Sequence, residues 1–428
     1  MVVSENIFYD CIVVGGGPGG STAAAFLSRR GKKVLLIEKE RFPRDKTCGD
    51  AISGKSLAIL SELGLVDGVE KADHGEITGV LFSSPNGSVA SIPFGKSGGQ
   101  MENSGRNFPE AEPAGSGKIA KGYVCRRQVY DNLLFQNAKK GCDAMEGMAA
   151  TALVKENGVV AGVKARGQDG KEYEFRGKMV IGADSVNSVV AREIRGAEVD
   201  PDHSCIAYRT YYSGISGMAG CLEIHFVKSI MPGYFWIFPL ENGLANVGVG
   251  MVMSDMKKKG IDLGKAMDDI IRNNPLFKER FAGAKMVSPL KAWQLPFGSK
   301  KRKVHAQNVL LVGDAAGLVD PFSGEGVGNA MLSGKIASDV AYEALAAGDT
   351  SEAFLSRYDE RLWKAVWNEL SASYQMQRLG KVEFLLNFVV GKAAKSERAR
   401  EAISGTLANK EAKGEYASPL FYLKLLFD

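Results

Sequence analysis

The sequence has little of what metal sites, disulfide frameworks and membrane spans require. Its 428 residues include four histidines, and its six cysteines lie far apart without a Cys-x-x-Cys pair. These spacings exclude the usual zinc patterns and indicate reduced thiols. No apolar run approaches the roughly 18 residues of a spanning helix, and the first residues lack the pattern of a signal peptide. We therefore expect a cytoplasmic protein without a bound metal.

The sequence also lacks a strong excess of one charge. It has 54 Lys and Arg against 49 Asp and Glu, a net charge of +5, and the positive residues are scattered. This surplus is too small to indicate nucleic acid binding, although it does not oppose contact with an anionic lipid surface. With 45% hydrophobic and 24% charged residues the composition is globular. The length suggests two or three domains.

The clearest motif present lies near the start of the chain. Residues 8–14 predict a buried strand, residues 15–20 (Gly-Gly-Gly-Pro-Gly-Gly) a tight turn, and residues 21–30 a helix. A second buried strand at 34–37 ends at Glu38. Gly-x-Gly-x-x-Gly between a strand and a helix, with an acid at the end of the next strand, is typical of dinucleotide sites. A glycine-rich turn without a ligand is the alternative.

Each position of this motif has a physical reason. Gly15 permits the tight turn, Gly17 lets a pyrophosphate approach the backbone, and Gly20 allows the helix to pack closely on the strand. The Glu38 carboxylate would accept hydrogen bonds from ribose hydroxyls. Its charge would repel a 2′-phosphate, so NADP is disfavoured at this site.

A second glycine-rich region lies some 300 residues further on. A buried strand that starts at Val309 delivers Asp314 at its tip, and glycines 324, 326 and 328 open the next helix. A carboxylate there can hold a ribityl or ribose hydroxyl, and free N–H groups at the helix start can face a flavin edge or a phosphate. Two such segments in one fold suit a long, extended ligand.

The rest of the chain divides by its patterns. Residues 86–122 are rich in Gly, Ser, Pro and Asn and predict a flexible excursion. The other segments predict a hairpin of 154–166 with 171–176 across the turn at 169–170, a buried strand at 179–183, an antiparallel sheet within 204–300, and helices from about 335 onward.

Four segments together resemble a known group of flavoproteins. Residues 15–20, Arg127, residues 182–192 and residues 313–328 are similar, in kind and order, to the FAD signatures of p-hydroxybenzoate-hydroxylase-type flavoproteins. Ser185 departs from that pattern, which usually has glycine there, and suggests a changed turn. The resemblance implies bound FAD, with cofactor contacts from Gly15, Gly17, Pro18, Gly20, Glu38, Cys48, Gly49, Ala51, Arg127, Ala150, Asp314, Gly326 and Val327.

Two further segments narrow the resemblance. Residues 46–51 (Lys-Thr-Cys-Gly-Asp-Ala) and 232–239 (Pro-Gly-Tyr-Phe-Trp-Ile-Phe-Pro), with a later Gly-x-Gly, are similar to the geranylgeranyl reductase family. The resemblance implies an FAD-dependent reductase that saturates isolated C=C bonds of geranylgeranyl chains, as in archaeal membrane lipid precursors. It also implies a prenyl-lipid site formed by Tyr234, Trp236, Phe238, Pro239, Gly248 and Gly250.

The residues themselves fit this chemistry. On an alternating strand Tyr234, Trp236 and Phe238 point to one face and form an aromatic wall. Such a wall suits a polyprenyl chain and could stabilise carbocation character by roughly 0.5–2 kcal/mol, although an ordinary sheet core is the alternative. Cys48 is a candidate proton donor beside the flavin and Asp50 a second one. A lone cysteine is otherwise most often a small buried hydrophobe.

Other functions remain open from the sequence. Residues 233–239 also come close to the halogenase pattern Gly-Trp-x-Trp-x-Ile-Pro, so a flavin monooxygenase or halogenase is one alternative. A reductase of quinone or chlorophyll prenyl side chains is another, and a prenyl-lipid carrier without chemistry is a third. The electron donor of a reductase would be ferredoxin or NAD(P)H bound transiently, since the sequence has no second complete dinucleotide motif.

These patterns predict a mixed α/β protein of three parts. A discontinuous Rossmann-type FAD-binding domain comprises residues 1–85, 120–190 and 301–345, and an antiparallel-sheet catalytic domain comprises 86–119 and 191–300. Residues 346–428 form a helical region with conspicuously apolar segments. We expect these helices to cover the prenyl tunnel or to touch the membrane surface.

Overall fold

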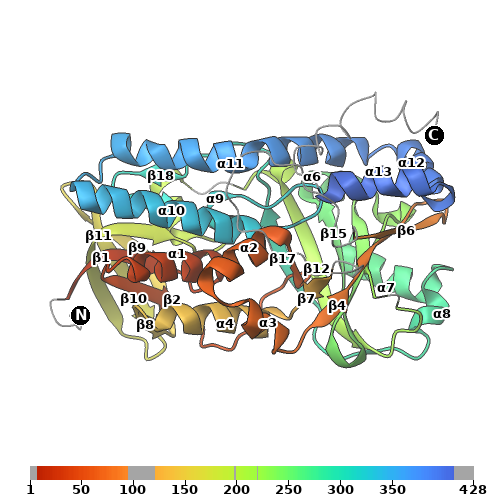
Figure 1. Cartoon of the computed structure of the whole chain (residues 1–428), viewed down its shortest axis with the longest axis horizontal. Helices are drawn as coiled ribbons and strands as arrows, with labels where there is room; N and C mark the ends of the chain where they lie inside the picture. Colours follow the sequence, from red (N-terminus) through yellow and green to blue (C-terminus); the bar gives the residue numbers. More distant parts are fainter. Residues whose placement is uncertain (1–6, 95–120, 197–198, 219, 409–428) are drawn as a thin grey trace, which may run out of the picture.

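The computed structural model describes residues 7–94, 121–196, 199–218 and 220–408. Two large sheets lie beside each other along the longest axis, and long helices run over them (Figure 1). The first sheet has the strand order β18 (His305–Ala306), β19 (Val309–Leu311), β11 (Glu172–Gly182), β1 (Phe8–Val14), β2 (Val34–Glu38), β8 (Asp143–Glu146). In addition, β10 (Val159–Gly167) pairs with β11, and β9 (Met148–Glu156) pairs with β10. Its parallel centre confirms the predicted mixed α/β class with a Rossmann-type sheet.

The parallel centre of this sheet forms because its strands are apolar on both faces. Residues 11–14 of β1 lie between β2 and the last part of β11, and all three segments are buried. The turn at 15–17 then leads into helix α1 (Pro18–Arg29), which has proline at its first position, where the missing N–H costs nothing. The sequence therefore predicts this unit correctly.

Close packing of α1 on α10 (Val327–Ala347) brings the two glycine-rich segments together. A Cβ on Gly334 of α10 would lie 2.3 Å from the carbonyl oxygen of Gly19 in α1. A Cβ on Gly19 would in turn lie 3.0 Å from the Ala330 carbonyl oxygen. Because these glycines let the helix backbones approach, residues 15–20 and 313–328 end side by side at one edge of the first sheet.

The second sheet carries the aromatic segment. Its order is β16 (Lys285–Met286), β12 (Ser204–Ser213), β15 (Leu244–Val252), β14 (Tyr234–Pro239), β13 (Leu222–His225), β5 (Gly79–Ser83), β6 (Val89–Pro93), with β17 (Lys291–Pro296) paired to β12. In the antiparallel pair of β14 and β15, Trp236 lies opposite Gly248 and Phe238 opposite Asn246. A third, small sheet joins β3 (Ala51–Ile52), β7 (Gly122–Val124) and β4 (Gly75–Ile77).

Two local predictions were wrong in detail. The run predicted as one strand at 154–166 is two strands, because Asn157 and Gly158 both take positive φ (50° and 82°) and close a hairpin between β9 and β10. The hairpin across 169–170 is confirmed, and its second strand β11 continues into the segment predicted separately at 179–183. In the predicted excursion at 86–122, residues 89–93 form β6, and residues 95–120 lie outside the described residues.

The C-terminal part is helical, as predicted, and α12 (Glu383–Lys395) and α13 (Glu397–Ala408) pack on β6 (Figure 1). No helix among the described residues is long and apolar enough to cross a membrane. The remaining helices are α2 (Gly54–Leu63), α3 (Val66–Glu70), α4 (Arg127–Lys139), α5 (Val189–Arg195), α6 (Met253–Lys259), α7 (Leu263–Asn273), α8 (Lys278–Phe281), α9 (Gly313–Ala316) and α11 (Glu352–Leu379).

Candidate active site

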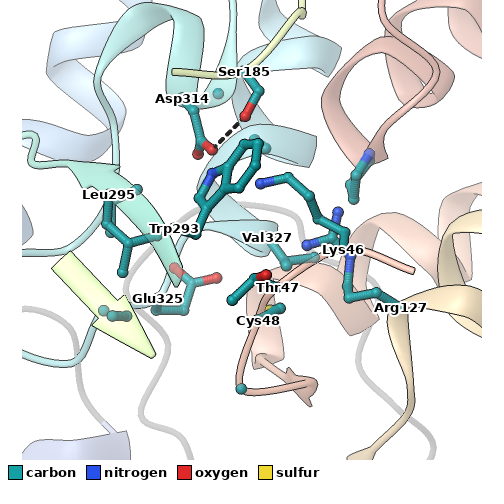
Figure 2. Close-up of a pocket in the computed structure, with 18 of the residues that line it drawn as sticks. Lys46, Thr47, Cys48, Arg127, Ser185, Trp293, Leu295, Asp314, Glu325 and Val327 are labelled. Atoms are coloured by element: carbon teal, nitrogen blue, oxygen red, sulfur yellow. Dashed lines mark hydrogen bonds between the residues drawn. The ribbon is translucent and has the colours of Figure 1, made fainter. Parts of the chain in front are cut away.

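A cavity of about 1090 Å³ lies where the two large sheets meet. Its volume is at the upper end of the range for small-molecule sites, so it can hold a dinucleotide and part of a second ligand. Most residues predicted for cofactor and substrate line it together: Gly15, Gly17, Pro18, Glu38, Cys48, Gly49, Asp50, Ala51, Arg127, Ala150, Asp314, Gly326, Val327, Tyr234, Trp236, Phe238 and Gly250. Figure 2 shows part of this lining.

The glycine turn at the start of α1 is shaped for a ligand. Gly15 has φ +104°, and a Cβ there would lie 2.4 Å from the Ala183 carbonyl oxygen. A Cβ on Gly20 would lie 1.8 Å from the Gly15 carbonyl oxygen, so Gly20 serves packing and not the cavity lining. A Cβ on Gly17 would have its nearest contact at 3.7 Å, with Arg44 Nη2. The described protein atoms thus leave room at Gly17, as close approach of a pyrophosphate requires.

The Glu38 carboxylate is fixed at the end of β2. It is 6% exposed and accepts hydrogen bonds from the backbone N–H groups of Gly16 (2.7 Å) and Glu40 (3.1 Å). A carboxylate offers about four lone-pair positions, so two remain for ribose hydroxyls. This arrangement fits the adenosine half of FAD.

A further part of the cavity lining is formed by Asp314, Ser185 and the start of α10. Ser185 has φ +67°, which explains why glycine is usual there, and its hydroxyl donates to Asp314 Oδ2 at 3.0 Å (Figure 2). Ser185 thus adopts the left-handed conformation that favours glycine and adds a side-chain contact to Asp314. Gly326 is the N-cap of α10 and lines the cavity with Val327, whereas the Gly328 N–H of the first turn donates to Glu325 Oε1 at 2.6 Å. The Asp314 carboxylate and the backbone at Gly326 and Val327 fit the ribityl and flavin part of FAD.

Two cavity residues that the sequence analysis missed are Lys46 and Trp293. The Lys46 ammonium lies 3.8 Å from the centre of the Trp293 ring (Figure 2). Burial lowers the pKa of Lys46 to about 8. The position of Lys46 two residues before Cys48 was a usable signal, whereas Trp293 lies on a strand without a motif. A cation in this position adds positive charge to the flavin side of the cavity.

The predicted aromatic wall exists and is continuous. The ring centroids of Tyr234 and Trp236 are 6.0 Å apart, and those of Trp236 and Phe238 are 6.2 Å apart. Tyr234 donates its hydroxyl to the Ser323 carbonyl oxygen at 2.8 Å, which ties the wall to the loop before α10. The built Cβ of Gly49 would lie 2.9 Å from Phe238, so the other end of the wall reaches the loop that contains Cys48.

The glycines of the Gly-x-Gly element have different roles. A Cβ on Gly248 would lie 2.2 Å from the Trp236 ring, so glycine is required there to seat the indole. A Cβ on Gly250 would lie 3.4 Å from Cys205 Sγ, which is an ordinary contact, and Gly250 lines the cavity. Among the described residues, Gly248 and Pro239 lie behind the wall and are not part of the cavity lining.

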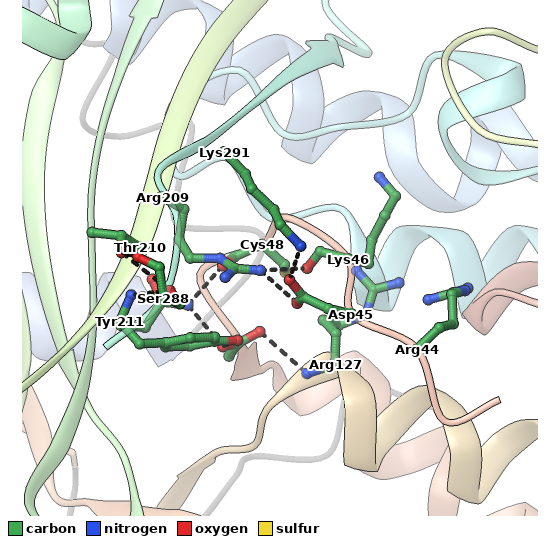
Figure 3. Close-up of polar contacts among 12 residues, drawn as sticks. Arg44, Asp45, Lys46, Cys48, Arg127, Arg209, Thr210, Tyr211, Ser288 and Lys291 are labelled. Atoms are coloured by element: carbon green, nitrogen blue, oxygen red, sulfur yellow. Dashed lines mark hydrogen bonds and ion pairs between the residues drawn. The ribbon is translucent and has the colours of Figure 1, made fainter. Parts of the chain in front are cut away.

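A buried polar cluster surrounds Asp50. The Asp50 carboxyl group accepts hydrogen bonds from Tyr211 Oη (2.8 Å), Asn246 Nδ2 (2.7 Å) and the backbone N–H of Arg127 (3.3 Å). Arg209 lies over the Tyr211 ring and pairs with Asp45 in the same view (Figure 3). Burial raises the pKa of Asp50 to about 6, against the effect of these donors and of Arg209.

Tyr211 and Asn246 were not predicted from the sequence as site residues. One signal was available for Asn246, since it is a lone polar side chain in the otherwise apolar strand 244–252. Cys48 is half-buried at the cavity, and its carbonyl oxygen accepts a hydrogen bond from Asn246 Nδ2 at 2.7 Å. The structure therefore brings both candidate proton donors, Cys48 and Asp50, to one end of the aromatic wall.

Comparisons with known proteins agree with this site. Residues 9–208 match the model of an FAD binding domain, and residues 203–288 match the geranylgeranyl reductase catalytic domain. Digeranylgeranylglycerophospholipid reductase 1 of Methanococcoides burtonii is 32% identical over 368 residues, which cover 85% of this chain and 81% of the relative. The corresponding reductase of Methanosarcina acetivorans is 32% identical over 378 residues, covering 83% and 80%.

Solved structures of flavoproteins also superpose on this chain. A geranylgeranyl bacteriochlorophyll reductase-like protein from Thermoplasma acidophilum superposes with a TM-score of 0.76 at 25% identity, covering 97% of this chain and 99% of that one. A flavin-dependent brominase, with a TM-score of 0.73 at 20% identity over 95% and 94% of the chains, shares the fold alone. The prediction of an FAD-dependent oxidoreductase is confirmed, and the chain belongs to the geranylgeranyl reductase family.

Proposed function

We propose that this protein saturates isolated C=C bonds in the geranylgeranyl chains of archaeal-type membrane lipid precursors. The observation that carries the proposal is one cavity in which a dinucleotide cradle adjoins a continuous aromatic wall. An apolar chain laid along that wall gains about 0.8 kcal/mol for each buried CH₂ group. The names of the reductase relatives support the same substrate class.

The cofactor would be held at both ends of the cradle. Gly17 and the start of α1 would face the pyrophosphate, Glu38 the adenosine ribose, and Asp314 with the first turn of α10 the ribityl and flavin part. Reduced FAD supplies the hydride that adds to one alkene carbon. The aromatic residues would exclude water and orient the alkene, and their ring faces would stabilise positive charge on the other carbon.

The second alkene carbon needs a proton from the protein. Asp50 and Cys48 are the candidates, and we favour Asp50 because its carboxyl group is buried and burial raises its pKa to about 6. The new C–H bond forms as the Asp50 O–H bond breaks, and the carboxylate that remains is stabilised by Tyr211 and Asn246. Solvent then restores the proton. Asp50→Asn should abolish turnover, whereas Cys48→Ala should retain most of it.

The direct test is mass spectrometry of lipids incubated without oxygen with the dithionite-reduced, FAD-loaded protein. A digeranylgeranylglycerophospholipid should gain pairs of hydrogens, and the mass increase counts the saturated bonds. A quinone with a prenyl side chain is the competing substrate in the same assay. Gain only on the quinone would overturn the lipid assignment, and no gain on either would overturn the reductase proposal.

We also propose that helix α12 touches the membrane surface. Phe384 is 73% exposed and stacks near Phe388, and Val382 beside it is 46% exposed. Lys392 and Lys395 lie in the last turn of α12 and could pair with anionic headgroups. Phe384→Ser should reduce flotation with anionic vesicles several-fold. Met286→Ser, at an exposed apolar site on β16 (56% exposed), should not; equal flotation of both variants would contradict the contact.

Two further assignments complete the proposal. The FAD part would comprise residues 1–85, 120–190 and 301–345, the substrate part 86–119 and 191–300, and the C-terminal helices 346–428. The electron donor, ferredoxin or NAD(P)H, would bind transiently. Stopped-flow reduction of the bound flavin by each donor in turn would identify it by the faster rate.

A further inference from the structure

We propose that Asn246 is a positioning residue that couples the seat of Trp236 to the carboxyl group of Asp50. The inference deepens the proposed function and rests on it for the role of Asp50 as the acid. Its basis is a fully buried chain of three side chains that runs from the substrate wall to that acid.

The hydrogen-bond chain has a fixed direction. The indole N–H of Trp236 can only donate, and it donates to Asn246 Oδ1 at 2.9 Å. The oxygen of the Asn246 amide is thereby identified, so its Nδ2 must supply the remaining bonds. Nδ2 donates to Asp50 Oδ2 and to the Cys48 carbonyl oxygen, both at 2.7 Å. Trp236 and the Cys48 carbonyl oxygen together therefore determine which end of the amide faces Asp50.

Burial makes this arrangement depend on the indole. Asn246 is 0% exposed, so water cannot easily replace a lost partner. Without the indole N–H, the amide oxygen would be an unsatisfied buried acceptor, which costs about 1–3 kcal/mol. Rotation of the amide would relieve that cost but would turn its oxygen toward the Asp50 carboxylate. Rotation removes the donor that Asp50 receives, and without rotation the amide loses the polarisation by the indole N–H and becomes a weaker donor.

The seat of the indole lies on the same strand pair. Trp236 lies opposite Gly248 in the register of β14 and β15, and Gly248 has no side chain because the indole occupies that space. Asn246 lies two residues before Gly248 on β15. A prenyl chain that contacts the wall therefore contacts the residue that holds the amide of Asn246. The position of the Trp236 ring and the hydrogen bonding of Asp50 are therefore linked through Asn246.

Other groups around Asp50 define what the coupling changes. Arg209 and Tyr211 act on it from β12, the backbone N–H and the charge of Arg127 from the start of α4, and Cys125 from the residue after β7. Cys48 lies two residues before it. The charge of Arg209 and the donors favour the carboxylate, and burial favours the acid. Loss of the Asn246 donor should therefore shift the titration of Asp50 to higher pH.

Infrared titration of the FAD-loaded protein tests this coupling directly. The carboxylic acid band that disappears in Asp50→Asn reports the protonation of Asp50. In Asn246→Leu and in Trp236→Phe we expect the midpoint of this band to rise by at least half a pH unit. Trp293→Phe is the matched control, because Trp293 lines the same cavity and its indole N–H has no hydrogen-bond partner among the described residues.

The outcomes separate the two proposals. An unchanged midpoint in Trp236→Phe overturns the coupling, and this variant keeps an aromatic ring in place should Asn246→Leu fail to fold. A shift of equal size in Trp293→Phe also overturns it, since the effect would then not need the indole bond. If the band moves and the pH profile of turnover moves with it, both proposals hold. If the band moves alone, the coupling stands and Asp50 is not the acid.

Discussion

The two ends of the cavity differ in how the chain builds them. The dinucleotide end uses backbone from one short stretch, residues 15–20, completed by Glu38 on the neighbouring strand. The acid end uses side chains from segments far apart in the chain, among them Asp50, Tyr211 and Asn246. The first end depends on the absence of side chains and the second on their exact partners. Substitutions at the dinucleotide end should therefore act through steric clashes, and those at the acid end through lost hydrogen bonds.

The largest effect should come from a side chain added at the dinucleotide end. Gly20→Ala places a Cβ 1.8 Å from the Gly15 carbonyl oxygen, and backbone must shift to accept it. We expect a loss of about 3 kcal/mol in the free energy of unfolding and at least a tenfold loss of FAD affinity. Urea denaturation and flavin absorbance measure the two. Gly283→Ala, where a Cβ would meet no described atom within 4 Å, is the control and should be nearly neutral.

A glycine behind the aromatic wall should separate activity from cofactor binding. Gly248→Ala places a Cβ 2.2 Å from the Trp236 ring and should displace the indole. We expect at least a tenfold loss of kcat with FAD still bound. Gly250→Ala, two residues on, meets its nearest atom at 3.4 Å and should lose less than threefold. Equal losses in both variants would show that the seat of the indole is not what matters.

The raised pKa of Asp50 should make the free energy of unfolding depend on pH. Burial raises the pKa of Asp50 to about 6 from an ordinary 3.8, so the folded state binds the proton more tightly than the unfolded state. The contribution of Asp50 to stability is therefore complete below about pH 4 and is lost as the pH rises through about 6. Relative to Asp50→Asn, the native protein should lose about 2 to 3 kcal/mol between these limits. Chemical denaturation at each pH measures this difference, and a flat difference would contradict the raised pKa.

The smallest effect should come from Ser185. Ser185→Ala keeps a Cβ at φ +67° and loses the bond to Asp314, whereas Ser185→Gly loses the same bond but relieves the backbone. We expect the glycine variant to be about 1 kcal/mol more stable than the alanine variant. Thermal unfolding of the pair measures this difference. If alanine is the more stable variant, the left-handed turn does not carry the strain.

The sequence predicted contiguous features well. The unit from 8 to 38 could be read because glycine spacing, apolar strands and a terminal acid act on near neighbours. The hairpin at Asn157 was missed although its Asn-Gly pair was visible in the sequence. Tyr211 and Asn246 could not be predicted as partners of Asp50, since nothing local links residues that lie 161 and 196 positions away from it.

The sequence by itself determined the cofactor class, the parallel centre of the first sheet and the aromatic face of the segment 234–238. These follow from backbone geometry and from the two-residue repeat of a strand, which act within a few positions. Only the tertiary structure decided that the indole of Trp236 rests on Gly248 and holds Asn246 against Asp50. Hydrogen bonds between buried side chains depend on strand register and helix packing, and those are set by the fold as a whole.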